Sequence, residues 1–206
     1  MLARTDIHSR EEVLSIYQQL NRYTKYLIYI TILVFILGII TYGQPFSFID
    51  HAISHFGRIR TQDGSPNTLS LLIYGTGMLL SALVCYKLSR LAESNSSSKL
   101  LSLAAVGYIL LIIPCDTLNT LHSIGGALVI GSLWLFTVIL IHHLLKHSKK
   151  NSLYIYHLIL QGTVLPYAFL YATGSPLRHL VQKFAVLGLI ISLKLVFHEY
   201  GKTYEK

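Results

Sequence analysis

Six long apolar stretches, separated by short segments that hold most of the charged residues, constrain this chain more than any other feature. The spans that they predict are residues 26–42, 68–86, 100–115, 123–145, 153–173 and 180–197. About 20 apolar residues are enough for a helix to cross the hydrocarbon core of a bilayer. The sequence therefore predicts an all-α membrane protein, a compact bundle of six transmembrane helices. Because the third stretch is short and the sixth contains Lys183 and Lys194, five or seven spans are the alternatives.

Composition narrows the class of protein further. Of the 206 residues, 52% are hydrophobic and 13% are charged. A disordered chain has the opposite composition, and a soluble domain has about twice this share of charged residues. The net charge of +8 comes from lysines and arginines scattered between the apolar stretches. A nucleic-acid partner would instead favour a clustered basic stripe with interleaved aromatic residues, so no nucleic acid is expected as a partner.

The distribution of positive charge predicts the orientation of the chain. Most of the 17 lysines and arginines lie in residues 1–25, in the second and fourth loops, and in the tail, residues 200–206. Since cytoplasmic segments of membrane proteins are enriched in such residues, both termini are expected to be cytoplasmic. Residues 1–25 form an amphipathic segment expected on the cytoplasmic membrane surface, and residues 26–199 form the transmembrane domain. We expect a multi-pass protein of the cell membrane, in the simplest case a prokaryotic plasma membrane.

Polar residues gather in the three loops that this orientation places outside. The first, third and fifth loops supply, in that order, Asp50, His51 and His55; Asp116 and His122; and Arg178 and His179. All lie near predicted helix ends at one membrane face, and three loops of a small bundle lie close together. The sequence therefore predicts an outward-facing polar pocket.

One interpretation of this pocket is a metal site. His51 and His55 are four residues apart, so on a helix they would share a face and hold one zinc ion. Asp116 and His122 would complete the ligand set and act as the catalytic residues of a hydrolase for a lipid ester or amide. The alternative is that His51 and His55 are interfacial residues that hold no ligand. Asp116 would then be a carboxylate at a helix end that fixes its loop in place. Zinc is the one cofactor that the sequence suggests.

A second interpretation is a binding site for a lipid headgroup. The guanidinium of Arg178 can hold a phosphate, whereas Asp116 or His122 can bond a hydroxyl or an amine. The ligand-binding residues of this hypothesis are Ser54, Asn67, Arg178 and His179. For Arg178, simple anchoring at the membrane interface is the alternative. Membrane lipid is the expected partner.

Several short motifs resemble those of one family of membrane proteins. They are Ile53-Ser-His-Phe-Gly57, Pro66-Asn67 before the second span, Ile113-Pro-Cys-Asp116 followed by His122, and Arg178 to Lys183 before the last span. Together they resemble the six-helix bacterial and archaeal family catalogued as domain of unknown function number 998. That family is similar in pattern to the Frag/DRAM/Sfk membrane proteins, which are tied to lipid-anchor remodelling and lipid organisation. The positions that match are Ser54, Gly57, Pro66, Asn67, Asp116 and His122.

Three functions follow as hypotheses. The first is a non-enzymatic protein that binds or organises lipid through the outward pocket. The second is the metal-dependent lipid hydrolase. In its Ser47-x-x-x-His51 motif the chain resembles the zinc hydrolases of the ceramidase and adiponectin-receptor superfamily, but Gln62 stands where their pattern has Asp. The third is a small-molecule or proton-coupled transporter, against which the absence of a mid-span carboxylate counts. A purely structural role is the remaining alternative.

Overall fold

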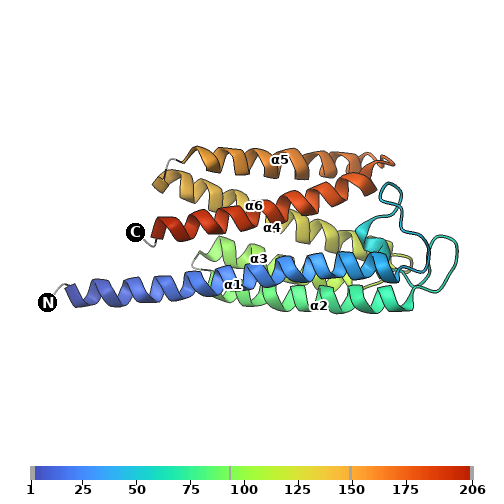
Figure 1. Ribbon diagram of the computed structural model, residues 1–206, viewed down its shortest axis with the longest axis horizontal. Helices are drawn as coiled ribbons and strands as arrows, with labels where there is room; N and C mark the ends of the chain where they lie inside the picture. Colours follow the sequence, from blue (N-terminus) through green and yellow to red (C-terminus); the bar gives the residue numbers. More distant parts are fainter. Residues whose placement is uncertain (1–2, 93, 149, 205–206) are drawn as a thin grey trace.

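The computed structural model describes residues 3–92, 94–148 and 150–204, and the side chains of residues 18–92, 94–147 and 150–200. This part of the chain forms six α-helices and one short 3-10 helix (Figure 1). The elements are α1 (Ala3–Thr41), η1 (Ile53–Gly57), α2 (Thr68–Leu91), α3 (Asn95–Leu111), α4 (Asn119–Ser148), α5 (Asn151–Ala172) and α6 (Arg178–Tyr204). The prediction of an all-α fold with six helices is confirmed for the described residues.

Five of the six helices are long and apolar enough to cross a membrane. They are α1, α2, α4, α5 and α6. Helix α3 has 17 residues, which at 1.5 Å per residue gives a length of about 25 Å, against a hydrocarbon core about 30 Å thick. The outer faces of the long helices bear large apolar side chains, and Ile40 and Leu158 are each 71% exposed. Surfaces of this kind are typical of helices that face lipid.

Helix ends agree with the local sequence. Helix α3 stops shortly before Pro114, and the residue before a proline disfavours helical backbone. Helix α5 is followed by Gly174, whose φ is 69°. Many helices end at a glycine in this left-handed conformation. No Gly or Pro lies between Ala3 and Leu37, and α1 accordingly runs without a break from Ala3 to Thr41. Residues 3–25, expected as a separate segment, are therefore continuous with the first span.

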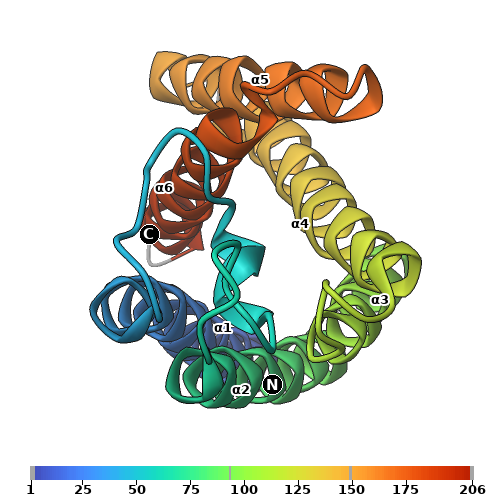
Figure 2. The ribbon, with the colours of Figure 1, turned by 90° about the vertical axis from the view of Figure 1, so that its right-hand side faces the viewer.

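The two termini lie at one end of the bundle, and the loops 42–67, 112–118 and 173–177 lie at the other (Figure 1). Seen from the loop end, the helices form a ring with η1 inside it, and α5 lies outside α4 and α6 (Figure 2). Figure 1 also shows that α4 and α5 lie close together near their connection and diverge toward the loop end. This divergence opens the region in which the candidate site lies.

Small residues and aromatic residues fill the bundle differently. A Cβ atom added at Gly107 of α3 would lie 2.8 Å from the main-chain oxygen of Gly125 in α4, and the reverse substitution is equally close. These two glycines therefore allow the backbones of α3 and α4 to touch.

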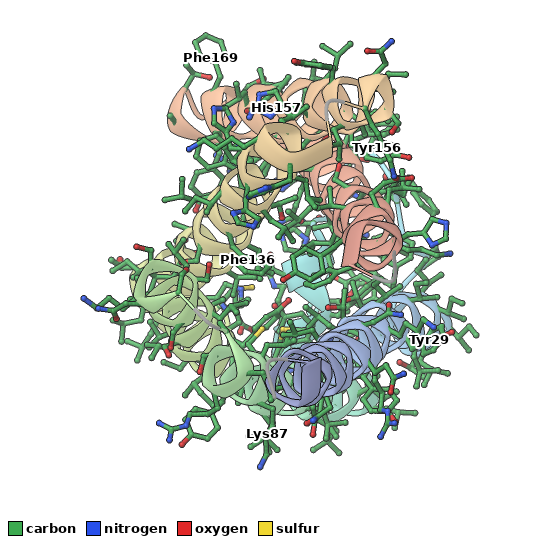
Figure 3. All side chains as sticks on the ribbon, turned by 90° about the vertical axis from the view of Figure 1, so that its left-hand side faces the viewer. Tyr29, Lys87, Phe136, Tyr156, His157 and Phe169 are labelled. Carbon is green, nitrogen blue, oxygen red and sulfur yellow. The ribbon has the colours of Figure 1, made fainter. Side chains whose placement is uncertain are left out.

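From α4, Phe136 points into the interior of the ring, whereas Lys87 and Phe169 point away from it (Figure 3). The Phe136 ring packs against Phe197 of α6, with 6.3 Å between the ring centroids.

Candidate functional site

The first loop, residues 42–67, is folded against the ends of the helices and bonded to two of the other segments at that end of the bundle. From α6, the Gln182 side-chain oxygen accepts a hydrogen bond from the Ile53 main-chain N–H at 2.8 Å. The Lys183 ammonium donates to the main-chain oxygens of His51 at 2.6 Å and His179 at 2.8 Å. The turn between α3 and α4 reaches the same loop through Asp116. These bonds confirm that the first, third and fifth loop segments converge at one end of the bundle.

The Asp116 carboxylate accepts hydrogen bonds from main-chain N–H groups of the first loop. Its Oδ1 and Oδ2 accept hydrogen bonds from the Ile59 N–H at 3.1 and 3.0 Å, and Oδ2 also accepts from the Arg60 N–H at 3.1 Å. The residue itself is exposed, and it does not line the cavity described below. In this arrangement the carboxylate acts as an anchor for the returning half of the first loop.

The buried side chain of Asn67 holds the same loop through hydrogen bonds. Its side chain is 1% exposed, and its Nδ2 donates to the main-chain oxygens of Phe56 at 3.1 Å and Arg58 at 3.0 Å. Its Oδ1 accepts from the Gly43 N–H at 3.3 Å. All of these partners are backbone groups of residues 43–58. The residue expected as a ligand contact therefore organises the loop.

Three histidines, two from the loop and one from α6, lie in a row near η1. The ring centroids are 5.9 Å apart for His51 and His55, and 5.2 Å apart for His55 and His179. Burial, reinforced by the neighbouring charges of His179 and Arg58, lowers the pKa of His55 to about 3, so that its ring is neutral at pH 7. His55 Nδ1 accepts a hydrogen bond from the Ala52 N–H, which leaves the ring proton on Nε2.

The four residues of the hypothesised metal site do not form a ligand cluster. Among the described residues, no group of three or more His, Cys, Asp or Glu side chains is placed to hold a metal ion. His51 uses Nδ1 to accept from the Ser47 N–H at 3.0 Å, and its Nε2 lies 2.9 Å from Nε2 of Gln44. The segment that holds His51 and His55 is a turn followed by η1, so the shared helical face assumed for the pair is not formed.

A cavity of about 690 Å³ lies below the loop, between α4, α5, the start of α6 and η1. Its size is within the range of small-molecule sites in proteins. Polar side chains line its outer part, which is the end near the first loop. They are Ser54, His55, Arg58, Gln62, Asn119, His122, Ser123, Tyr167, Tyr171, Arg178, His179 and Gln182. Apolar or small residues and the indole of Trp134 line its inner part: Leu111, Gly126, Ala127, Ile130, Gly131, Trp134, Val164, Leu165 and Ala168. The cavity is therefore amphipathic along its length.

The length and the charge of the cavity are both distinctive. Its lining on α4 begins at Asn119 and reaches Trp134, a distance of about 22 Å along the helix at 1.5 Å per residue. Two arginines, Arg58 and Arg178, lie at the outer part, and none of the described lining residues is acidic. An ion pair joins Lys150 to Glu199, near the opposite end of the bundle. The outer part of the cavity is thus suited to an anionic group.

His122 has an unusual place in the cavity wall. It is 4% exposed, and its Nδ1 lies 2.6 Å from the main-chain oxygen of Ile113. Its Nε2 is buried and has no hydrogen-bond partner among the described residues. The thiol of Cys115 lines the cavity nearby, and burial raises the pKa of this thiol to about 11. Cys115 is therefore present as the thiol at neutral pH, which is the unreactive form.

The predicted site residues fall into two groups. Ser54, His55, His122, Arg178 and His179 line the cavity, whereas His51, Asn67 and Asp116 hold the loop that covers it. Sequence reasoning did not select the lining residues Arg58, Gln62, Trp134, Tyr167 and Gln182. For two of these residues the sequence offered a signal. Gln182 lies next to Lys183, a lysine inside the sixth apolar stretch, and Trp134 is the chain's one tryptophan.

No known family model, curated protein or solved structure matches this chain. The resemblance to the six-helix family of unknown function accordingly stays a hypothesis.

Proposed function

We propose that this protein binds a lipid whose anionic headgroup lies at Arg58 and Arg178 and whose acyl chain lies along α4 and α5 toward Trp134. The observation that supports the proposal is the amphipathic cavity, which has cationic and polar side chains at its outer end and apolar side chains over the rest of its length. A phosphate accepts several hydrogen bonds from guanidinium groups, and an acyl chain gains free energy when apolar residues remove it from water. A ligand with both properties fits the cavity better than a purely polar solute.

The membrane topology belongs to the same proposal. We take α3 as a sixth, short span, because it packs between α2 and α4 along the ring of helices (Figure 2). Both termini then lie in the cytoplasm of a cell whose plasma membrane holds the protein, and the cavity opens at the outer face. A headgroup from the outer leaflet would reach Arg58 and Arg178 without crossing the membrane.

Native mass spectrometry tests the proposal on the full chain purified in mild detergent. Wild type is expected to retain one lipid per chain, and Gly131→Phe is expected to lose it. A Cβ atom at Gly131 meets nothing within 4 Å, and the residue lines the cavity, so a phenyl group there fills the space that the acyl chain needs.

Gly162→Phe is the matched control. A Cβ atom at Gly162 also meets nothing within 4 Å, but this glycine is not part of the cavity wall. The control is expected to retain lipid as wild type does. Equal lipid content in all three proteins would show that the retained lipid lies elsewhere.

A further inference from the structure

The backbone of the first loop fixes the orientation of one side-chain amide in the cavity wall. Gln182 of α6 lines the cavity, and its Oε1 accepts a hydrogen bond from the Ile53 main-chain N–H at 2.8 Å. Because a main-chain N–H only donates, the oxygen of this amide must lie toward the loop and its N–H₂ group is left to donate elsewhere. That group donates to the hydroxyl oxygen of Tyr167 in α5 at 3.3 Å.

The bond from Gln182 makes the Tyr167 hydroxyl a donor toward any further partner. It occupies a lone pair of the phenol oxygen, so the hydroxyl proton remains to be donated. No described residue accepts this proton. Tyr167 and Gln182 both line the cavity, and the hydroxyl that joins them therefore lies in its wall.

Two guanidinium groups lie at the same end of the cavity without an acidic partner. Arg178 is one helical turn before Gln182 on α6, so the two residues share a face of the helix. The Arg178 guanidinium lines the cavity and forms neither an ion pair nor a hydrogen bond with another described residue. Arg58 donates through Nε to the main-chain oxygen of Arg60 at 3.1 Å, which is an uncharged partner. Two positive charges are therefore left for a ligand.

The carboxylates of the neighbouring loops are bonded elsewhere. Asp50 accepts a hydrogen bond from the Ser47 hydroxyl, and Asp63 accepts one from the Thr61 hydroxyl, each at 2.6 Å. Asp116 accepts from main-chain N–H groups. None of the three lines the cavity, so a headgroup with a cationic part, such as choline, meets no carboxylate there. The arrangement favours a headgroup that is anionic throughout.

We infer that the lipid of this cavity has a phosphomonoester headgroup, whose charges Arg58 and Arg178 balance and one of whose oxygens accepts a hydrogen bond from the Tyr167 hydroxyl. The inference rests on the proposed lipid-binding function and names the class of headgroup. A phosphomonoester has three terminal oxygens and up to two negative charges, whereas a phosphodiester has two such oxygens and one charge. Tyr167 is in this view a specificity-determining residue, because it bonds the oxygen that a diester lacks.

The test compares three lipids on the full-length wild-type protein in a nonionic detergent at about pH 8, where a phosphomonoester is doubly charged. The probes share one dibrominated stearyl chain and differ only in the headgroup, which is a phosphate, its methyl ester or phosphocholine. Bromine quenches indole fluorescence, and Trp134, the one tryptophan of the chain, lines the cavity. The phosphate is expected to bind about tenfold more tightly than its methyl ester, a loss typical of one hydrogen bond to a charged group. It is also expected to bind more tightly than the phosphocholine.

Tyr167→Phe is the second arm, because it keeps the aromatic ring and removes the hydroxyl. The ratio of the affinities for the phosphate and its methyl ester is expected to fall severalfold in this variant. Tyr171→Phe is the matched control, since Tyr171 lines the cavity one turn farther along α5 and no hydrogen bond with a described residue orients its hydroxyl. The control is expected to keep the wild-type ratio. An unchanged ratio in Tyr167→Phe, or an equal fall in both variants, would overturn the role of Tyr167.

The comparison of lipids on wild type needs no variant, so it is decisive even where Tyr167→Phe fails to fold. Saturable binding of the phosphate and its methyl ester with equal affinity would overturn the phosphomonoester class and leave lipid binding intact. Binding of the phosphocholine as tight as that of the phosphate would do the same. Absence of saturable quenching by any of the three lipids would overturn the lipid-binding function and the inference together.

Discussion

At the scale of single residues, the first loop is held by a few side chains that form hydrogen bonds with its backbone. Asp116 accepts hydrogen bonds from two N–H groups, Asn67 donates to the carbonyls of Phe56 and Arg58, and Lys183 donates to that of His51. A loop has backbone groups that no helix or sheet satisfies, so such side chains decide whether it keeps one conformation. Because this loop covers the cavity, residues that do not line the cavity still determine its shape.

Asp116→Asn is expected to loosen the loop and leave the bundle intact. The substitution places an amide N–H₂ group against the N–H donors of Ile59 and Arg60, with a cost of about 1–2 kcal/mol at this exposed site. Hydrogen exchange of these two amides should become about tenfold faster in the folded protein, while the Tm falls by only a few degrees. Asp50→Asn is the control, because the Asp50 carboxylate accepts a hydrogen bond from the Ser47 hydroxyl of its own turn, whereas the Ile59 and Arg60 N–H groups donate to Asp116. Unchanged exchange at both amides would contradict the anchoring role of Asp116.

The sequence directed attention to Asp116, Asn67, His55 and Arg178 because polar residues near apolar spans need partners. What it did not contain was the path of the first loop, which brings backbone donors to Asp116 and backbone acceptors to Asn67. The direction in which a side chain points depends on that path, and spacing along the chain does not determine it. For the same reason the sequence did not show that Trp134 and Gln182 line one cavity.

At the scale of elements, the contact between α3 and α4 depends on small residues, because main-chain atoms meet there. The predicted spans 100–115 and 123–145 correspond to helices Asn95–Leu111 and Asn119–Ser148, which meet at Gly107 and Gly125. The hydrophobic pattern gives the helices because apolar runs of this length have few other solutions in a membrane. It gives their ends less well, because polar residues can extend a helix beyond the apolar run.

Gly125→Ala and Gly126→Ala form a matched pair of neighbours on α4. The Cβ of the first would lie 2.8 Å from the Gly107 main-chain oxygen, whereas that of the second would lie 3.9 Å from the side chain of Leu111. Gly125→Ala should destabilise the protein by about 1–3 kcal/mol, as overpacking does, and lower its Tm by several degrees. Gly126→Ala should leave the Tm unchanged or raise it, since alanine favours helix more than glycine does. Thermal unfolding followed by circular dichroism distinguishes them, and equal Tm values would contradict the close contact.

At the scale of the whole molecule, the ring of helices places a polar loop cluster at one end and both termini at the other (Figure 1, Figure 2). The count of six helices, and the meeting of the first, third and fifth loop segments, follow from the order of apolar and charged stretches in the sequence. The cavity does not follow from that order, because it depends on the divergence of α4 and α5 near the loop end. Two helices joined by a short connection can pack along their whole length or diverge, and the sequence pattern is the same in both cases.

Quenching of Trp134 fluorescence by an anionic lipid with a brominated chain is the most direct test of the central claim, that a lipid lies inside the bundle. The account predicts saturable quenching at one site per chain, reversed by the same lipid without bromine. Gly131→Phe should abolish this saturable component, and Gly162→Phe should keep it. Quenching that rises linearly with lipid, and equally in wild type and both variants, would mean that the lipid meets Trp134 only from the surrounding micelle and would contradict the claim.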